Sequence, residues 1–155
     1  LAVAYVRGVQ SGGVATTTKH FVANDSEYER NSIDSVVPER ALREVYLAPF
    51  EAVVTEAGAW GIMSSYNRVD ETFMGENHRL LTGVLRDEWG FDGVVVSDWY
   101  GTRSTEAAVR AGLDLDLSHH GVSNHSGDEA REPIASRHRS TVVYGSLAQL
   151  DGESS

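Results

Sequence analysis

Several polar residues that could bind or react with a ligand follow short apolar runs of the sequence. They are Lys19, His20, Tyr66, Asp98 and Trp99. Together they offer a carboxylate, two potential cations, a phenol and an indole. This mixture suits a neutral, hydroxyl-rich ligand, because polar groups bond hydroxyls while an indole packs on the apolar face of a sugar ring.

Asp98 is the strongest candidate for a reactive group. It follows three consecutive valines, and an ionised carboxylate there is costly to bury unless it is paired or hydrogen-bonded. A structural alternative is that Asp98 caps the helix that follows, as Asp often does. Position alone gives the two interpretations about equal weight.

Lys19 and His20 allow more than one interpretation. Lys19 could be a Schiff-base lysine of the kind that barrel aldolases use. Adjacent residues of a regular strand point to opposite faces, so both side chains face one pocket only if the strand bulges. Otherwise one of the two is structural.

Arg30, Met63 and a possible metal site have modest support from the residues alone. Arg30 lies among acidic residues of a loop, where a solvated salt bridge is the ordinary interpretation. Met63 and Trp99 are by default core residues near the rim of a sheet. No metal is expected, because the group Asp114, Asp116, His119 and His120 has no defined ligand geometry. No cofactor is expected either.

The apolar pattern alternates between short β-rich runs and longer helical runs, which predicts βα units and a parallel sheet. Residues 1–10 are expected to be the last turns of an amphipathic helix. Pro49 should kink or split its helix. The run Val94, Val95 and Val96 is typical of a strand buried on both faces. The other expected strands are 13–21, 60–66 and 113–117; the expected helices are 38–55, 80–89 and 102–111, and the expected loops 22–37 and 67–77.

The apolar face of the helix at 38–55 is predicted from residues that recur at helical spacing. They are Leu42, Val45, Leu47, Phe50, Val53 and Val54. Residues 118–155 show little sustained periodicity and are expected to form a weakly ordered tail.

Composition excludes several classes of protein. The 155 residues are 41% hydrophobic and 23% charged, which is globular, and no apolar run approaches the roughly 20 residues of a membrane helix. A net charge of −10 disfavours nucleic acid and anionic lipid partners. Cysteine is absent and no signal peptide is expected, so cytoplasmic and secreted locations are both compatible with the sequence.

Several ordered motifs resemble glycoside hydrolase family 3, in particular its β-glucosidases. They are KHFVANDSEYER, LREVYLAPFEAVV, GIMSSYNRVD, LLTGVLRDEWGFDGVVVSDW and AGLDLDL, within residues 2–117. The resemblance implies that Asp98 is the nucleophile and that a second carboxyl group, about 5 Å away in a retaining site, serves as acid and base. It also implies a glucose subsite lined by Lys19, His20, Arg30, Tyr66 and Trp99, with Met63 nearby.

The resemblance implies a (β/α)8 barrel, of which this chain would hold about half, because a whole barrel needs about 250 residues. Residues 1–117 would be the barrel fragment and 118–155 a divergent tail. The partners would be a β-glucoside or oligosaccharide and the missing strands and second domain of a parent enzyme, which would supply the acid/base. The isolated chain is expected to be unstable or self-associating, with little or no activity. The alternative is a non-catalytic sugar-binding or interaction module.

Overall fold

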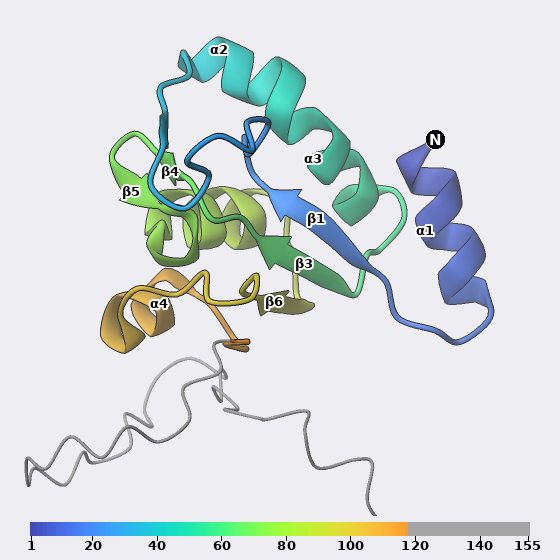
Figure 1. The fold of residues 1–155 in the computed structure, drawn as a ribbon. Coiled ribbons are helices and arrows are strands. Elements are labelled where there is room, and N and C mark those ends of the chain that lie inside the picture. Colours follow the sequence, from blue (N-terminus) through green and yellow to red (C-terminus); the bar gives the residue numbers. More distant parts are fainter. Residues whose placement is uncertain (118–155) are drawn as a thin grey trace, which may run out of the picture.

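The structure, a computed structural model, describes residues 1–117 of the chain. Its centre is a three-stranded parallel sheet in the order β1 (Thr17–Phe21), β3 (Gly61–Ser64) and β6 (Val94–Val96), seen in Figure 1. Helical segments connect each strand to the next. The predicted α/β alternation is confirmed for this part of the chain.

The helical segments between and around the strands vary in type. They are α1 (Ala2–Ser11), α2 (Glu39–Ala41), η1 (Leu42–Leu47), α3 (Ala48–Thr55), η2 (Met74–Glu76), η3 (Arg79–Glu88) and α4 (Thr105–Ala111). Segments η1 and η3 are π-helical, and η2 is a 3₁₀ turn. The predicted helix at 38–55 changes type just before Pro49, which has no amide to donate, so the expected division is confirmed.

Two predicted core residues are wrong. Val45 is 64% exposed, because the i→i+5 spacing of η1 places Leu42 and Leu47 on the buried face and turns Val45 away. Val94 is 49% exposed, whereas Val96 on the same face of β6 is only 7% exposed, so this face is covered at one end of the strand only. Gly61, the register partner of Val94 in β3, lies on the same face of the sheet as Val94.

Two predicted loops contain short strands. Residues 22–37 include β2 (Asp34–Ser35), and residues 67–77 include β4 (Arg68–Val69) and β5 (Thr72–Phe73). They form a second small sheet in the order β2-β4-β5. The predicted strand at 113–117 is reduced to a single bridge between Leu115 and Val96. Two-residue strands are too short for sequence periodicity to indicate.

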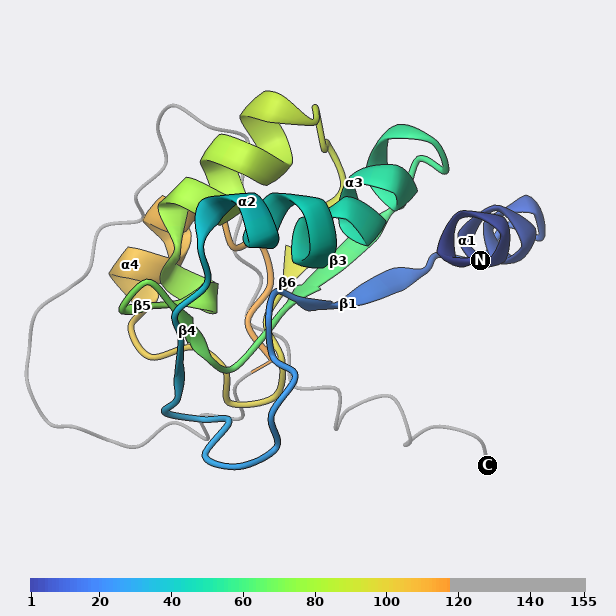
Figure 2. The same cartoon turned by 90° about the horizontal axis from the view of Figure 1, so that it is seen from above.

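One continuous core joins the helices to a single face of the central sheet. It includes Phe21, Ile62 and Val95 from the strands, together with residues of α3 and η3, which Figure 2 shows from above. Ile62 and Val95 are register partners and therefore point to the same side. Helix α1 packs on α3 through a smaller cluster that contains Val6 and Val53. The helices thus fix the sheet from one side.

No helix in residues 1–117 has the length and apolarity to cross a membrane. The expected tail at 118–155 lies outside the described residues.

Candidate functional site

The end of β1 contains a β-bulge at the Lys19–His20 pair. Thr18 pairs with Ile62 and Phe21 with Ser64, so three steps along β1 match two steps along β3. The extra residue breaks the strict alternation of faces. His20 is partly buried and faces Asp98, while Lys19 is exposed. Of the two alternatives that the sequence left open for this pair, the structure shows the bulge.

Asp98 is the second residue after the end of β6 and is only 7% exposed. Its Oδ2 lies 3.1 Å from His20 Nε2, and its Oδ1 accepts the Trp99 backbone N–H at 2.8 Å. The phenol of Tyr66 lies close enough to this carboxylate for the Asp98 charge to raise its pKa. The His20 imidazole and the Tyr66 phenol are the neighbouring side-chain groups that can donate to this carboxylate.

A tight turn holds the backbone of Asp98. Gly101 N–H donates to the Asp98 carbonyl at 3.0 Å, and Tyr100 has a φ of 59°. A Cβ on Gly101 would lie 3.1 Å from that carbonyl, closer than most Cβ contacts. The helix α4 is instead capped by Ser104, whose hydroxyl accepts the Ala107 N–H. The structural alternative for Asp98, a helix cap, is therefore wrong.

Arg30 extends the cluster beyond the sheet. Its guanidinium lies 4.9 Å from the centroid of the Tyr66 ring, a cation–π distance. Its Nη1 also lies 3.0 Å from Glu27 Oε2, in an exposed ion pair of the kind that contributes little stability. Arg30 therefore makes both the loop salt bridge and the contact with Tyr66. It places a positive charge from the loop at 22–37 over the Tyr66 ring.

The pKa values of His20 and Tyr66, the two side chains that face Asp98, shift in opposite directions. Burial lowers the pKa of His20, with smaller lowering effects from Lys19 and Arg30, and the Asp98 charge opposes this. Burial raises the pKa of Tyr66, and the charge and hydrogen bond of Asp98 raise it further. At neutral pH the site therefore holds a neutral imidazole and a neutral phenol against one carboxylate.

The Asp98→Asn variant should move both pKa values downward. Loss of the negative charge removes the influence that raises the pKa of His20 and part of what raises that of Tyr66. NMR titration of the imidazole and phenol signals measures both shifts. An unchanged His20 pKa in the variant would contradict the contact between His20 and Asp98.

In the wild-type chain, the free energy of unfolding should fall as the pH drops below the ordinary histidine pKa of about 6.5, because the unfolded state binds the proton first.

The remaining predicted site residues lie around this cluster. Trp99 is 45% exposed and contacts Asp98 through its backbone amide. Met63 is half-buried in β3, and its register partner is Val96, two residues before Asp98. The structure thus brings Asp98, His20, Tyr66 and Arg30 together, with Trp99 adjoining.

Asn67, a polar residue at the same strand end as Tyr66, supports the site together with Ser65, which sequence patterns did not single out. The buried Asn67 side chain donates to the carbonyls of Val22 and Ala23 at 3.1 and 3.2 Å. The Ser65 hydroxyl also donates to the Val22 carbonyl. These bonds join the start of the loop at 22–37 to the end of β3. The signal available in the sequence was the run of small polar residues directly after an apolar strand.

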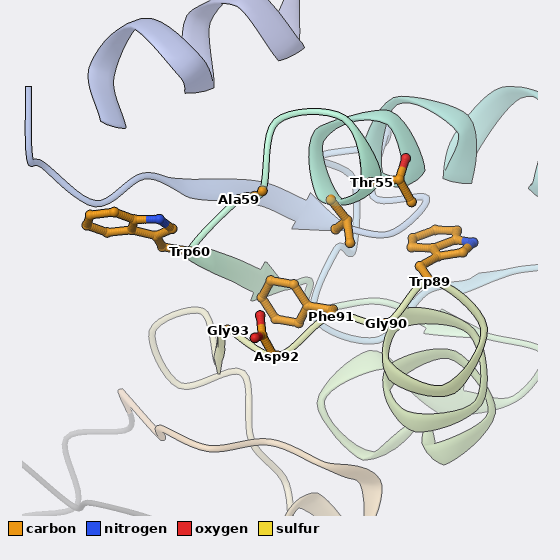
Figure 3. A pocket seen from close by; sticks show the side chains of 10 residues that line it. Thr55, Ala59, Trp60, Trp89, Gly90, Phe91, Asp92 and Gly93 are labelled. Carbon is orange, nitrogen blue, oxygen red and sulfur yellow. The ribbon is translucent and has the colours of Figure 1, made fainter. Parts of the chain in front are cut away.

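A pocket of about 500 Å³ lies at the opposite ends of the strands. Figure 3 shows Trp60, Trp89, Phe91 and Asp92 around it. Trp60 precedes β3 and Asp92 precedes β6, whereas Asp98 follows β6. Reactive groups of βα barrels lie where strands end, so this pocket is on the wrong edge for that chemistry.

Within residues 1–117 no group of three His, Cys, Asp or Glu residues is arranged to hold a metal ion. His119 and His120, which were part of the sequence-based metal group, lie outside the described residues.

The sequence matches a known family and known enzymes. The model of the glycosyl hydrolase family 3 N terminal domain matches residues 1–126. A β-glucosidase of Rhizobium radiobacter is 60% identical over 116 residues, covering 75% of this chain and 14% of that protein. A probable β-glucosidase K of Emericella nidulans is 50% identical over 117 residues, covering 76% of this chain and 14% of that protein. The chain thus spans about one seventh of these relatives' length.

Solved structures of β-glucosidases are also similar to this chain. A family 3 β-glucosidase of Bifidobacterium adolescentis is 47% identical with a TM-score of 0.73, covering 74% of this chain and 17% of that one. A β-glucosidase of Kluyveromyces marxianus in complex with glucose is 49% identical with a TM-score of 0.71, covering 72% of this chain and 13% of that one. The family match covers most of the residues, and the chain therefore belongs to glycosyl hydrolase family 3.

Proposed function

We propose that residues 1–117 are part of the catalytic barrel of a retaining glycosidase of the β-glucosidase type, with Asp98 as the nucleophile. The observation that carries this proposal is the Asp98 carboxylate, which is 7% exposed and contacts His20 and Tyr66 at the ends of neighbouring parallel strands. In a retaining reaction such a carboxylate attacks the anomeric carbon and forms a glycosyl-enzyme.

The cluster suits a nucleophile more than a proton donor. The Asp98 carboxylate faces an imidazole, a phenol and the Trp99 backbone N–H. The attacking group must be ionised, whereas the acid/base carboxyl must first carry a proton. We assign the acid/base role to a residue outside 1–117, in the further strands or second domain that the proposal requires.

The sheet supports a barrel in which these strands are neighbours. The three strands are parallel, their helices pack on one face, and the polar groups gather at the carboxyl ends. Val94 is exposed on the other face, the face that would line the inside of a closed barrel. Further strands and a second domain would complete that barrel and its subsite.

The substrate in this proposal is a terminal β-linked glucoside or a related sugar. One similar β-glucosidase was solved with glucose bound. The side chains that would contact sugar hydroxyls are Lys19, His20, Arg30 and Tyr66, and the exposed indole of Trp99 would pack on a ring face. Met63 would lie nearby on the inner face of β3.

An activated 2-fluoroglucoside tests the nucleophile in this chain without requiring the acid/base residue. A dinitrophenolate leaving group departs unprotonated, and the electron-withdrawing fluorine slows hydrolysis through the oxocarbenium-like transition state, so the glycosyl-enzyme accumulates. We expect intact-mass measurement to show addition of one fluoroglucosyl group and peptide mapping to place it on Asp98.

The Asp98→Asn variant is the matched control and should remain unlabelled. Glucose binding by the wild-type chain without any labelling would instead support a non-catalytic sugar-binding module. Label on another carboxylate would contradict the assignment of Asp98.

A further inference from the structure

A buried carboxylate behind the site holds both sides of the turn that carries Asp98. Asp116 is 7% exposed, and its Oδ1 accepts the Ser97 hydroxyl at 3.1 Å and the Thr102 hydroxyl at 2.8 Å. Ser97 directly precedes Asp98, and Thr102 directly follows Gly101, which closes the turn. One oxygen atom therefore joins the two ends of residues 97–102.

Ser97 is held by the segment around Asp116 through further bonds. Its hydroxyl accepts the Leu117 N–H at 2.8 Å, and its backbone N–H donates to the Leu115 carbonyl at 2.8 Å. Thr102 lies beyond the end of β6 and contacts this segment through its hydroxyl. The Thr102 bond to Asp116 therefore holds the far end of the turn, which the pairing of β6 does not hold.

We propose that Asp116 is a positioning residue for Asp98, acting through Ser97 and Thr102 to fix the turn that aims the carboxylate. This inference rests on the proposed function, because it assigns Asp116 to the same site. Asp116 does not touch the reacting atoms in this account. Its effect is geometric, and nucleophilic attack is sensitive to misplacement of about 1 Å.

The neighbouring Asp114 provides a comparison within the same segment. Its Oδ2 accepts Arg86 Nη2 at 2.6 Å and the Val95 N–H at 2.7 Å. These contacts lie behind the middle of β6 and involve no residue of the turn at 97–102. Asp114 thus stabilises the fold, whereas Asp116 also shapes the turn.

Thr102→Val and Thr102→Ser separate a positioning role from a structural one. Valine matches threonine in size but cannot donate to Asp116, while serine keeps the hydroxyl. In the full 155-residue chain, we expect Thr102→Val to speed hydrogen exchange of the Trp99 and Gly101 amides about tenfold relative to core amides, the scale of one lost charge-assisted hydrogen bond. Thr102→Ser should restore near wild-type exchange.

Labelling by the 2-fluoroglucoside gives the second measurement. Thr102→Val should lower the saturating labelling rate by about 10- to 100-fold, with little change in the reagent concentration that gives half the maximal rate. Asp114→Asn serves as the control for general destabilisation. It should speed exchange in the core and leave the labelling rate of the folded chain unchanged.

The outcomes separate this inference from the proposed function. The role of Asp116 would be overturned if Thr102→Val left hydrogen exchange unchanged. It would also be overturned if the variant sped exchange uniformly in the turn and the core. Equal saturating labelling rates in Thr102→Val and wild type would also overturn it. Label on a carboxylate other than Asp98 would refute the proposed function, while the exchange comparison would still decide whether Asp116 fixes the turn.

Discussion

Asp98→Asn should abolish turnover in a chimera that places this chain's residues in the matched segment of the Rhizobium radiobacter β-glucosidase. The 60% identity over 116 residues makes such an exchange feasible, and the recipient supplies the rest of the enzyme. The amide cannot form the glycosyl-enzyme, so kcat for an aryl β-glucoside should fall by about 10⁴-fold or more, the scale for loss of one member of a catalytic group.

Asp92→Asn in the same chimera is the matched control for this prediction. Asp92 is exposed and precedes β6, whereas Asp98 follows it, so one conservative change is made at each end of one strand. Asp92 also lines the pocket shown in Figure 3. Activity should be unchanged. A large loss in Asp92→Asn with a small one in Asp98→Asn would move the active site to the opposite ends of the strands.

Azide distinguishes a nucleophile from a residue that only binds substrate. In Asp98→Gly the side chain is removed, and azide can attack the anomeric carbon from the vacated side while the phenolate leaves. The product should be the α-glucosyl azide, identified by NMR, because a retaining nucleophile approaches a β-glucoside from the α face. Formation of the β-azide, or no rescue, would argue against Asp98 as nucleophile.

The main strands and helices were predictable because their residues repeat with clear periods. Val95 of β6 and the helix around Leu81 and Leu85 owe their signals to burial in one core. The short strands β2, β4 and β5 carry too few residues for a period. Val45 was misplaced because sequence spacing assumes 3.6 residues per turn, and η1 has π-helical hydrogen bonds.

The site was predictable only as a set of candidates. Strand-end position indicated Asp98, but only the structure shows that Ser104 caps α4 and that Asp98 contacts His20. Arg30 is 36 residues from Tyr66 in sequence, and no local pattern indicates that their side chains stack. Asp116 was considered only as a metal ligand, because its hydroxyl donors come from another segment.

Phe21→Ala should have the largest effect on folding. Phe21 is fully buried, and its ring packs edge-on against Phe50 at 5.1 Å and Trp89 at 6.2 Å between centroids. It thereby joins β1 to α3 and to the end of η3. Truncation of a buried Phe costs about 3–5 kcal/mol through lost transfer energy and the cavity left behind. Because whole domains are stable by only about 5–15 kcal/mol, urea denaturation should show a much lower midpoint or no folded baseline.

Two further variants test the cause of that loss. Phe21→Leu keeps much of the apolar volume and should recover most of the stability, whereas Val45→Ala, at a 64% exposed position, should change the free energy of unfolding by less than about 0.5 kcal/mol. A loss below about 1 kcal/mol in Phe21→Ala would mean that this core is not packed. Phe21 follows His20 directly, so the packing that folds the chain also holds the bulge that turns His20 toward Asp98. A folded Phe21→Leu chain should therefore keep the lowered pKa of His20.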